Sequence, residues 1–201
     1  MDPKLTALIL IGYQNDYFAP DGILHDVIED SSRLTTVCAN TIRIIECLVD
    51  TPMLMISTPI LFMPDYSELI EPVGILKTIK EVGAFKSGSP GSETINELLQ
   101  FGERIIEVPG KRGLNAFSNT KLDDILHEQE ITTIVLAGVV TSICIDSTGR
   151  SAFERGYKVL ILSDCTSGRT LFEQEYYCNN VFPLYAEVID HVQLLHRLGV
   201  K

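Results

Sequence analysis

The stretch that decides the fold is ITTIVLAGVVTSICIDSTGRSAFERGYKVLILSD, which spans residues 131–164. It begins with a continuous β-branched and apolar run, Ile131–Ala137, of the kind that forms a strand buried on both faces. Helical spacing follows over residues 142–155, and a second apolar run, Tyr157–Leu162, comes after a glycine. A strand, a helix and a second strand of these lengths predict a parallel crossover unit.

Cys144 is the candidate reactive residue of this unit. Gly138 is expected to end the first strand and Thr141 to cap the helix, which places Cys144 in the first helical turn. Ligands of parallel sheets bind beyond the carboxyl ends of the strands, and the free N–H groups of a helix N-terminus favour a thiolate. The position therefore suggests a nucleophile, whereas the alternative is a small buried residue, as most free cysteines are.

The composition indicates one acidic domain. A chain of 201 residues can bury a large core without staples, and a net charge of −11 without any Lys/Arg cluster argues against nucleic acid and anionic membranes as partners. The N-terminal apolar run is too short for a signal peptide, and no stretch is long enough to span a bilayer. Five scattered cysteines without a CxxC pair predict reduced thiols in a cytoplasmic protein.

Predicted strands and helices alternate through the rest of the chain. Further strands are expected at Leu5–Ile11, Pro52–Ser57, Arg104–Val108 and Ala186–Ile189. Helices are expected at residues 31–49, 120–128, 172–185 and 191–198, with shorter ones around 74–82 and 93–100. Residues 58–91, which hold four prolines, are expected as a long irregular excursion over the active-site face. The alternation predicts a single three-layer α/β domain, residues 1–201, with a mostly parallel sheet.

Four blocks of sequence resemble the isochorismatase-like superfamily of cysteine hydrolases, which includes nicotinamidases, N-carbamoylsarcosine amidases, ureidoacrylate amidases and the isochorismatases proper. The blocks are LILIGYQNDYF (Leu8–Phe18), GSPGSETINELL (Gly88–Leu99), EVPGKRGLNAFSNTKLDDIL (Glu107–Leu126) and TTIVLAGVVTSICIDSTGRSAFERGYKVLILSDC (Thr132–Cys165). The threonine three residues before the cysteine and the downstream F-x-R-G-Y fall at the family's spacing. The resemblance covers nearly the whole chain and implies a Rossmann-like α/β topology.

The resemblance also implies roles for individual residues. Cys144 corresponds to the nucleophile that attacks a carbonyl or nitrile carbon, and Lys111 to the lysine whose ammonium holds the thiolate and the substrate. A cis peptide bond is implied at Val139–Val140, where it would aim the Val140 and Cys144 N–H groups at a developing oxyanion. Without the resemblance, Lys111 would be interpreted as a solvated turn lysine.

Four aromatic residues are expected to line the pocket, namely Tyr13, Tyr17, Phe18 and Phe117. For Tyr13 the alternation of side chains leaves a second interpretation open, in which the ring points into the packing of the sheet.

Gly12 stands where the family carries its catalytic aspartate, in a pattern of the form I-D-x-Q-N-D-F. That aspartate takes the thiol proton and passes it to the leaving group, and the loss of such a group typically costs about 10²- to 10⁴-fold in rate. Asp16 matches a different family position, where it is expected to tie down the loop, and Asp146 is expected to face away from Cys144. Gly12 either leaves space beside Cys144 for a water or a substrate group, or serves the turn at the strand end.

No metal and no other cofactor is expected. The loop after the second strand, STPILFMPDYSEL, lacks the histidines by which metal-binding members hold zinc or iron, and the four histidines of the chain are scattered. Hydrolysis of isochorismate is less expected than thiol chemistry, because the isochorismatases proper depend on the aspartate.

The sequence therefore predicts a hydrolase of a small amide, carbamoyl or related substrate with an incomplete triad. The alternative is a catalytically impaired family member that binds a small molecule or a protein partner, and a redox-responsive thiol at Cys144 is a weaker third. The resemblance implies a homodimer or homotetramer.

Overall fold

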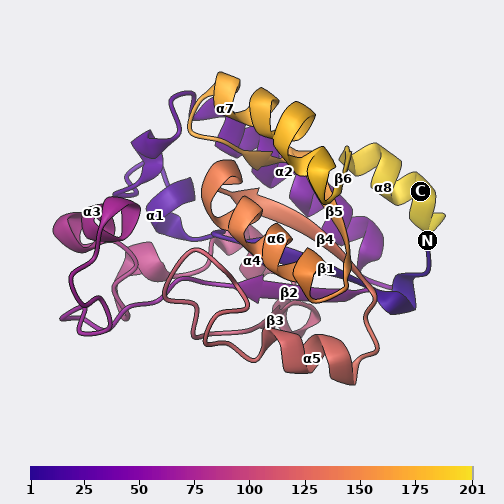
Figure 1. Ribbon diagram of the computed structural model, residues 1–201, viewed down its shortest axis with the longest axis horizontal. Helices are drawn as coiled ribbons and strands as arrows, with labels where there is room; N and C mark the ends of the chain where they lie inside the picture. The colour runs from indigo at the N-terminus through magenta and orange to yellow at the C-terminus, as the bar shows by residue number, and fades with distance from the viewer. Residues whose placement is uncertain (201) are drawn as a thin grey trace.

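Six strands form one sheet in the order β3–β2–β1–β4–β5–β6 in the computed structural model, which describes residues 1–200 (Figure 1). The strands are β1 Thr6–Ile11, β2 Leu54–Thr58, β3 Ile106–Glu107, β4 Thr133–Val139, β5 Lys158–Ser167 and β6 Glu187–Ile189. The α/β prediction is confirmed, and the sheet is parallel at every pairing. β1 and β4 lie at its centre and are buried along their whole length, because their residues are apolar on both faces.

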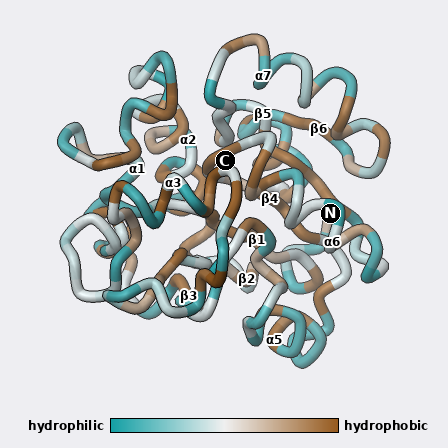
Figure 2. The backbone as a smooth tube through the Cα atoms, turned by 60° about the vertical axis from the view of Figure 1, so that its left-hand side comes forward, coloured by the Kyte–Doolittle hydropathy of each residue, from teal (hydrophilic) through white to brown (hydrophobic). Residues whose placement is uncertain are grey.

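Helices cover both faces of the sheet and complete the three layers. They are α1 Asn15–Phe18, α2 Ser32–Leu48, α3 Gly74–Val82, α4 Asn96–Leu99, α5 Leu122–Glu128, α6 Asp146–Glu154, α7 Leu171–Tyr176 and α8 His191–Leu198. Helices α2, α4 and α8 pack on one face, and α3, α5 and α6 pack on the other. In β1, Leu8 and Leu10 face α2 while Ile9 and Ile11 face α6, so that apolar strands lie inside a more polar shell (Figure 2).

The connection between β4 and α6 differs from the predicted one. β4 continues through Gly138 to Val139, because Gly138 has a φ of +123° and approaches β1 so closely that an added Cβ would overlap the Ile11 carbonyl oxygen. Residues Thr141–Ile145 then form a π-helical turn before α6 begins. The predicted helix cap at Thr141 is wrong: Val140 takes the cap position, and the Thr141 hydroxyl is used elsewhere.

Two segments in the last third of the chain also depart from the prediction. β5 runs to Ser167 rather than Leu162, after a register irregularity in its pairing with β4. The helix expected over residues 172–185 consists of α7, a π-helical turn at Tyr177–Val181 and a 3₁₀ turn at Phe182–Leu184. This stretch is helical throughout but is not one α-helix.

The proline-rich excursion of residues 58–91 is tied to the carboxyl end of the sheet. It contains α3, as expected, and two isolated parallel bridges join Ile60 to Lys111 and Phe62 to Lys86. At the opposite side of the molecule the two termini lie together (Figure 1), and the Met1 amino group donates to the Arg197 carbonyl oxygen at 2.9 Å. Within residues 1–200, no helix has both the length and the apolar character needed to cross a bilayer.

Candidate active site

The candidate site lies beyond the carboxyl ends of β1 and β4, the two strands from which the sheet grows in opposite directions. β1 leads into Gly12, and β4 leads through Val139–Val140 into the turn that carries Cys144. This is the switch point at which open parallel sheets bind their ligands. Cys144 occupies the expected place in the fold, although on a π-helical turn instead of an α-helical one.

Cys144 and Lys111 meet here from positions 33 residues apart. Lys111 Nζ lies 3.5 Å from Cys144 Sγ and donates a 2.7 Å hydrogen bond to the Gly113 carbonyl oxygen. Lys111 is fully buried and Cys144 is 2% exposed, so the interpretation of Lys111 as a solvated lysine is wrong. The bridge to Ile60 holds Lys111 in place, together with a 3.2 Å bond from Leu61 N to its carbonyl oxygen.

The environment of Lys111 disfavours a permanent charge. Burial lowers the pKa of the Lys111 ammonium from its ordinary value, and the neighbouring Cys144 acts in the opposite direction because a thiolate stabilises the charge. Among residues 1–200, no carboxylate oxygen lies within 4.0 Å of Nζ. The Cys144 thiol, 3.5 Å from Nζ, is thus the polar side chain that faces the Lys111 amine in this buried setting.

Gly12 does not leave an open space beside the thiol. Its φ is +75°, and a Cβ added there would lie 2.8 Å from the Val139 carbonyl oxygen and 3.6 Å from Cδ2 of Tyr17. Of the two interpretations of this glycine, the geometry fits the one in which it serves the turn at the strand end.

Tyr17 is a predicted pocket aromatic that lies near enough to Cys144 for the two groups to influence each other by charge. Its ring packs on Phe85 with the centroids 5.1 Å apart, within the same core cluster as Cys144. Burial raises the pKa of the Tyr17 phenol, and Cys144 and Asp16 raise it further by charge. The Tyr17 phenol therefore carries no charge at neutral pH.

The other predicted pocket aromatics lie elsewhere, which corrects the prediction for them. Tyr13 packs into the core on the α2 face, where its hydroxyl shares a 2.6 Å hydrogen bond with Thr41 and its ring stacks on Phe18 at 5.0 Å. Phe117 stacks at 6.1 Å on Tyr157, which directly precedes β5 and so lies at the amino end of the strands, whereas Cys144 lies beyond their carboxyl ends. Side chains alternate between the two faces of a strand, and Tyr13 follows the second of its two interpretations, in which the ring points into the packing of the sheet.

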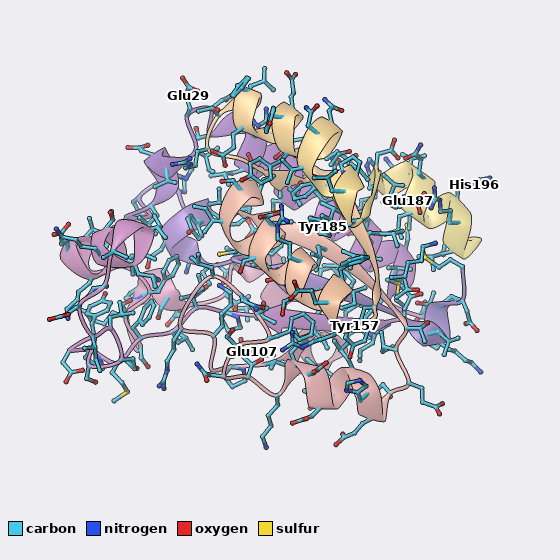
Figure 3. The ribbon with its side chains drawn as sticks, in the orientation of Figure 1. Glu29, Glu107, Tyr157, Tyr185, Glu187 and His196 are labelled. Atoms are coloured by element: carbon cyan, nitrogen blue, oxygen red, sulfur yellow. The ribbon has the colours of Figure 1, made fainter. Side chains whose placement is uncertain are left out.

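The two carboxylates considered as replacements for the aspartate are engaged away from the thiol. Asp16 Oδ2 accepts a 2.5 Å hydrogen bond from Phe85 N and so ties down the proline-rich excursion, as predicted. Asp146 accepts from Arg150 Nε and from the Tyr185 hydroxyl, each at 3.0 Å. Tyr185 lies over α6 (Figure 3). Neither carboxylate pairs with Lys111.

The turn around Cys144 contains the cis peptide bond that the resemblance implied. The Val139–Val140 peptide bond is cis. The Val140 carbonyl oxygen accepts from Ile143 N at 3.1 Å and from Ile145 N at 3.2 Å, which closes the turn around Cys144. The oxyanion hole formed by the Val140 and Cys144 N–H groups stays a prediction.

Besides Cys144 and Lys111, chemistry could reside in the other cysteines, in metal-binding clusters or in the hollows of the surface. All five cysteines are free thiols. Within the part of the chain that the structure describes, no cluster of three or more His, Cys, Asp or Glu side chains could hold a metal ion. A hollow of about 910 Å³ opens on the α2 face, remote from the thiol, and Phe18, Cys38 and Arg43 are among the residues that line it.

Sequence reasoning missed two residues of α7, Glu173 and Gln174, that contact the π-helical turn carrying Cys144. Both are buried, and their side chains bond to the hydroxyls of Ser142 and Thr141. The only signal was a pair of polar residues inside a predicted helix, which is the ordinary pattern of a solvated helix face.

A parallel α/β sheet with a buried cysteine and lysine at its switch point defines an isochorismatase-like protein. The family of the isochorismatase domain matches residues 6–193, and the chain belongs to this family. A ureidoacrylate amidohydrolase, RutB, from Methylobacterium radiotolerans is 29% identical over an alignment of 180 residues that covers 83% of this chain and 68% of that protein.

Solved structures share the fold at lower identity. A cysteine hydrolase from Pseudomonas syringae pv. phaseolicola superposes with a TM-score of 0.83 at 20% identity, over 99% of this chain and 94% of that one. The N-carbamoylsarcosine amidase from Thermoplasma acidophilum superposes with a TM-score of 0.74 at 22% identity, over 95% of this chain and 97% of that one.

Proposed function

We propose that this isochorismatase-family protein hydrolyses a small amide, carbamoyl or related C–N substrate, with Cys144 as the nucleophile and Lys111 as its proton partner. The observation that carries the proposal is the 3.5 Å contact between Lys111 Nζ and Cys144 Sγ in a fully buried setting. A buried lysine without a carboxylate is costly, and a thiolate is the partner that offsets this cost. The similarity to a ureidoacrylate amidohydrolase supports the choice of substrate class.

In the first half of the reaction, the proton held between Cys144 and Lys111 passes to the leaving group. With that proton on Lys111 Nζ, Cys144 Sγ is a thiolate and attacks the carbonyl carbon. The C–N bond then breaks, the leaving amine takes the proton from Nζ, and the acyl group stays on Sγ as a thioester. The N–H groups of Val140 and Cys144 stabilise the negative charge that develops on the carbonyl oxygen.

The second half restores the pair. Because burial lowers the pKa of Lys111, its amine can stay neutral after it has given up the proton, and a neutral amine is available as the general base. Water attacks the thioester carbon, its proton passes to Nζ, the C–S bond breaks, and the carboxylic acid leaves. Lys111 thereby gives and takes the protons that the aspartate exchanges in other members of the family, so an aspartate at position 12 is not required.

A panel of primary amides, N-carbamoyl amino acids and ureido acids tests the proposal by ammonia release. We expect turnover of at least one compound that falls by about 10³-fold or more in Cys144→Ala and in Lys111→Met. Rapid quenching and mass spectrometry are expected to find the acyl group on Cys144. Full activity of Cys144→Ala would refute thiol catalysis. If no compound is turned over but one of them raises Tm, the protein is the impaired, ligand-binding member instead.

A further inference from the structure

We infer that Gln174 of α7 is a positioning residue for Cys144, because it fixes the turn that carries the nucleophile through the hydroxyl of Thr141. Its neighbour Glu173 makes a second attachment to the same turn through Ser142. The catalytic meaning of the inference rests on the proposed function, whereas the attachment itself can be measured without any substrate.

The amide of Gln174 is bonded on both sides. Its Oε1 accepts from Thr141 Oγ1 at 2.5 Å and from Gly168 N at 2.8 Å. Its Nε2 donates to the Ser163 carbonyl oxygen at 2.9 Å and lies 3.1 Å from Thr166 Oγ1. The side chain thus joins the start of the nucleophile turn to three positions at the carboxyl end of β5 and just beyond it.

Only an amide satisfies this set of partners. Gln174 is 5% exposed and Thr141 is fully buried, so water cannot replace a lost bond at little cost. A carboxylate at position 174 would face the Ser163 carbonyl oxygen without a proton to donate. A leucine would leave the Thr141 hydroxyl and the Gly168 N–H without their acceptor.

Glu173 attaches the next residue of the turn. Its Oε1 accepts from Ser142 Oγ at 2.5 Å, and its Oε2 accepts from Arg169 Nε at 2.8 Å. Consecutive residues of α7 therefore hold consecutive residues of the turn, two and three positions before Cys144. Bonds at both of these positions restrict where the turn can place Sγ.

The attachment to α7 matters for the thiol because Lys111 is held independently. Lys111 is fixed from the other side, by its bridge to Ile60 at the end of β2. The distance between Nζ and Sγ is thus set by two anchors, one from β2 and one from β5 through Gln174. A change in the β5 anchor shifts Sγ while Nζ stays in place.

Hydrogen exchange of the peptide that covers residues 140–146, followed by mass spectrometry, tests the inference directly. We expect this peptide to exchange at least about ten-fold faster in Gln174→Leu and in Thr141→Val, which keeps the shape of the side chain but loses the hydroxyl. Thr141→Ser, which retains the hydroxyl, is expected to restore the original rate. Glu175→Leu is the matched control, because Glu175 is the next residue of α7 and is exposed.

The outcomes separate the inference from the proposed function. Unchanged exchange of residues 140–146 in both Thr141→Val and Gln174→Leu would overturn it, and so would an increase that is equal across all peptides. A local increase supports positioning even if no variant hydrolyses any amide, in which case only the proposed function fails. The thiolate absorbance near 240 nm, measured against Cys144→Ala, is expected to fall in the same two variants and not in Glu175→Leu.

Discussion

Gly12, which the resemblance places at the family's aspartate position, has a backbone conformation that disfavours any residue with a side chain. The residue has a φ of +75°, which costs a non-glycine residue about 1–2 kcal/mol, and an added Cβ would press on the Val139 carbonyl oxygen at 2.8 Å. We expect Gly12→Ala to lower the free energy of unfolding by about 2–4 kcal/mol in urea titrations. Gly12→Asp is expected to lose at least as much and to gain no activity.

Gly88→Ala is the control for this prediction. Gly88 has a similar φ of +81° but has nothing within 4 Å of an added Cβ, so we expect a loss of only about 1 kcal/mol. Equal losses at the two positions would show that the close approach to Val139 contributes nothing.

Lys111 is the residue whose removal separates reactivity from stability. In Lys111→Met the thiol loses its proton partner, and we expect alkylation of Cys144 by iodoacetamide at pH 7 to slow by about ten-fold or more. The Tm is expected to stay the same or rise, because the cost of a buried ammonium disappears. Mass spectrometry resolves Cys144 from the other thiols, and Lys121→Met, at an exposed lysine, serves as the control. An unchanged alkylation rate in Lys111→Met would contradict the pairing.

At the scale of elements, Arg104 closes the C-terminal end of α2. Its guanidinium donates to four backbone carbonyl oxygens at distances of 2.7–3.1 Å, those of Leu48, Val49, Thr51 and Met53. A helix end leaves its last carbonyl oxygens short of donors; Thr51 donates to that of Leu48, and Arg104 supplies a donor to all four. We expect Arg104→Ala to lower the free energy of unfolding by about 2–3 kcal/mol, since hydrogen bonds to a charged donor contribute about 1.5–3 kcal/mol.

Two further variants make this prediction specific. Arg104→Lys keeps the charge but not the planar fork, and is expected to recover less than half of the loss. Arg43→Ala removes an exposed arginine of α2 and is expected to change stability by less than about 0.5 kcal/mol. Full recovery in Arg104→Lys would mean that charge alone, and not the fork, closes the helix.

The elements that the sequence predicted well are those with a strong apolar period. β1, α2 and α3 have nearly the predicted bounds, because each presents an apolar face or run to a core. β3 is reduced to Ile106–Glu107, because it lies at the edge of the sheet with both residues exposed. The π-helical turn at Thr141–Ile145 could not be predicted from periodicity, since side chains of α7, distant in sequence, hold it.

At the scale of the molecule, the site depends on contacts that no local pattern contains. Cys144 could be placed at the switch point from the crossover unit alone, whereas Lys111 reaches it from a turn whose sequence predicts exposure. Phe117 packs on Tyr157, a partner from a distant segment, whereas the position of Tyr13 follows the local alternation of side chains. The role of Lys111 was predicted from the family resemblance alone. The prediction of an incomplete triad came from the glycine at position 12.

The wholly or partly buried thiols and phenols are expected to make the stability of the whole molecule depend on alkaline pH. Burial is the main cause that raises the pKa of Cys38 and of Cys178 to about 11 from an ordinary value of 9.0, and it also raises the pKa of Cys165, Tyr157 and Tyr185. A group with a raised folded pKa stabilises the fold fully below its unfolded pKa and loses that contribution as the pH rises through the folded value. We therefore expect Tm to hold up to about pH 8.5 and to fall between about pH 9 and 11.

Repulsion within an acidic chain would also lower Tm at high pH, and salt distinguishes the two causes. The net charge of −11 grows as the pH rises, but about 0.5 M NaCl screens repulsion between exposed charges and leaves the cost of ionising a buried thiol. We expect most of the alkaline fall in Tm to persist in salt and to shrink in the Cys38→Ala/Cys178→Ala double variant. Lys111 acts in the opposite direction, since its lowered pKa makes the fold more stable as the ammonium deprotonates, but it is one group against several. A fall that salt abolishes would assign the alkaline instability to surface charge, and the raised thiol pKa values would then have no part in it.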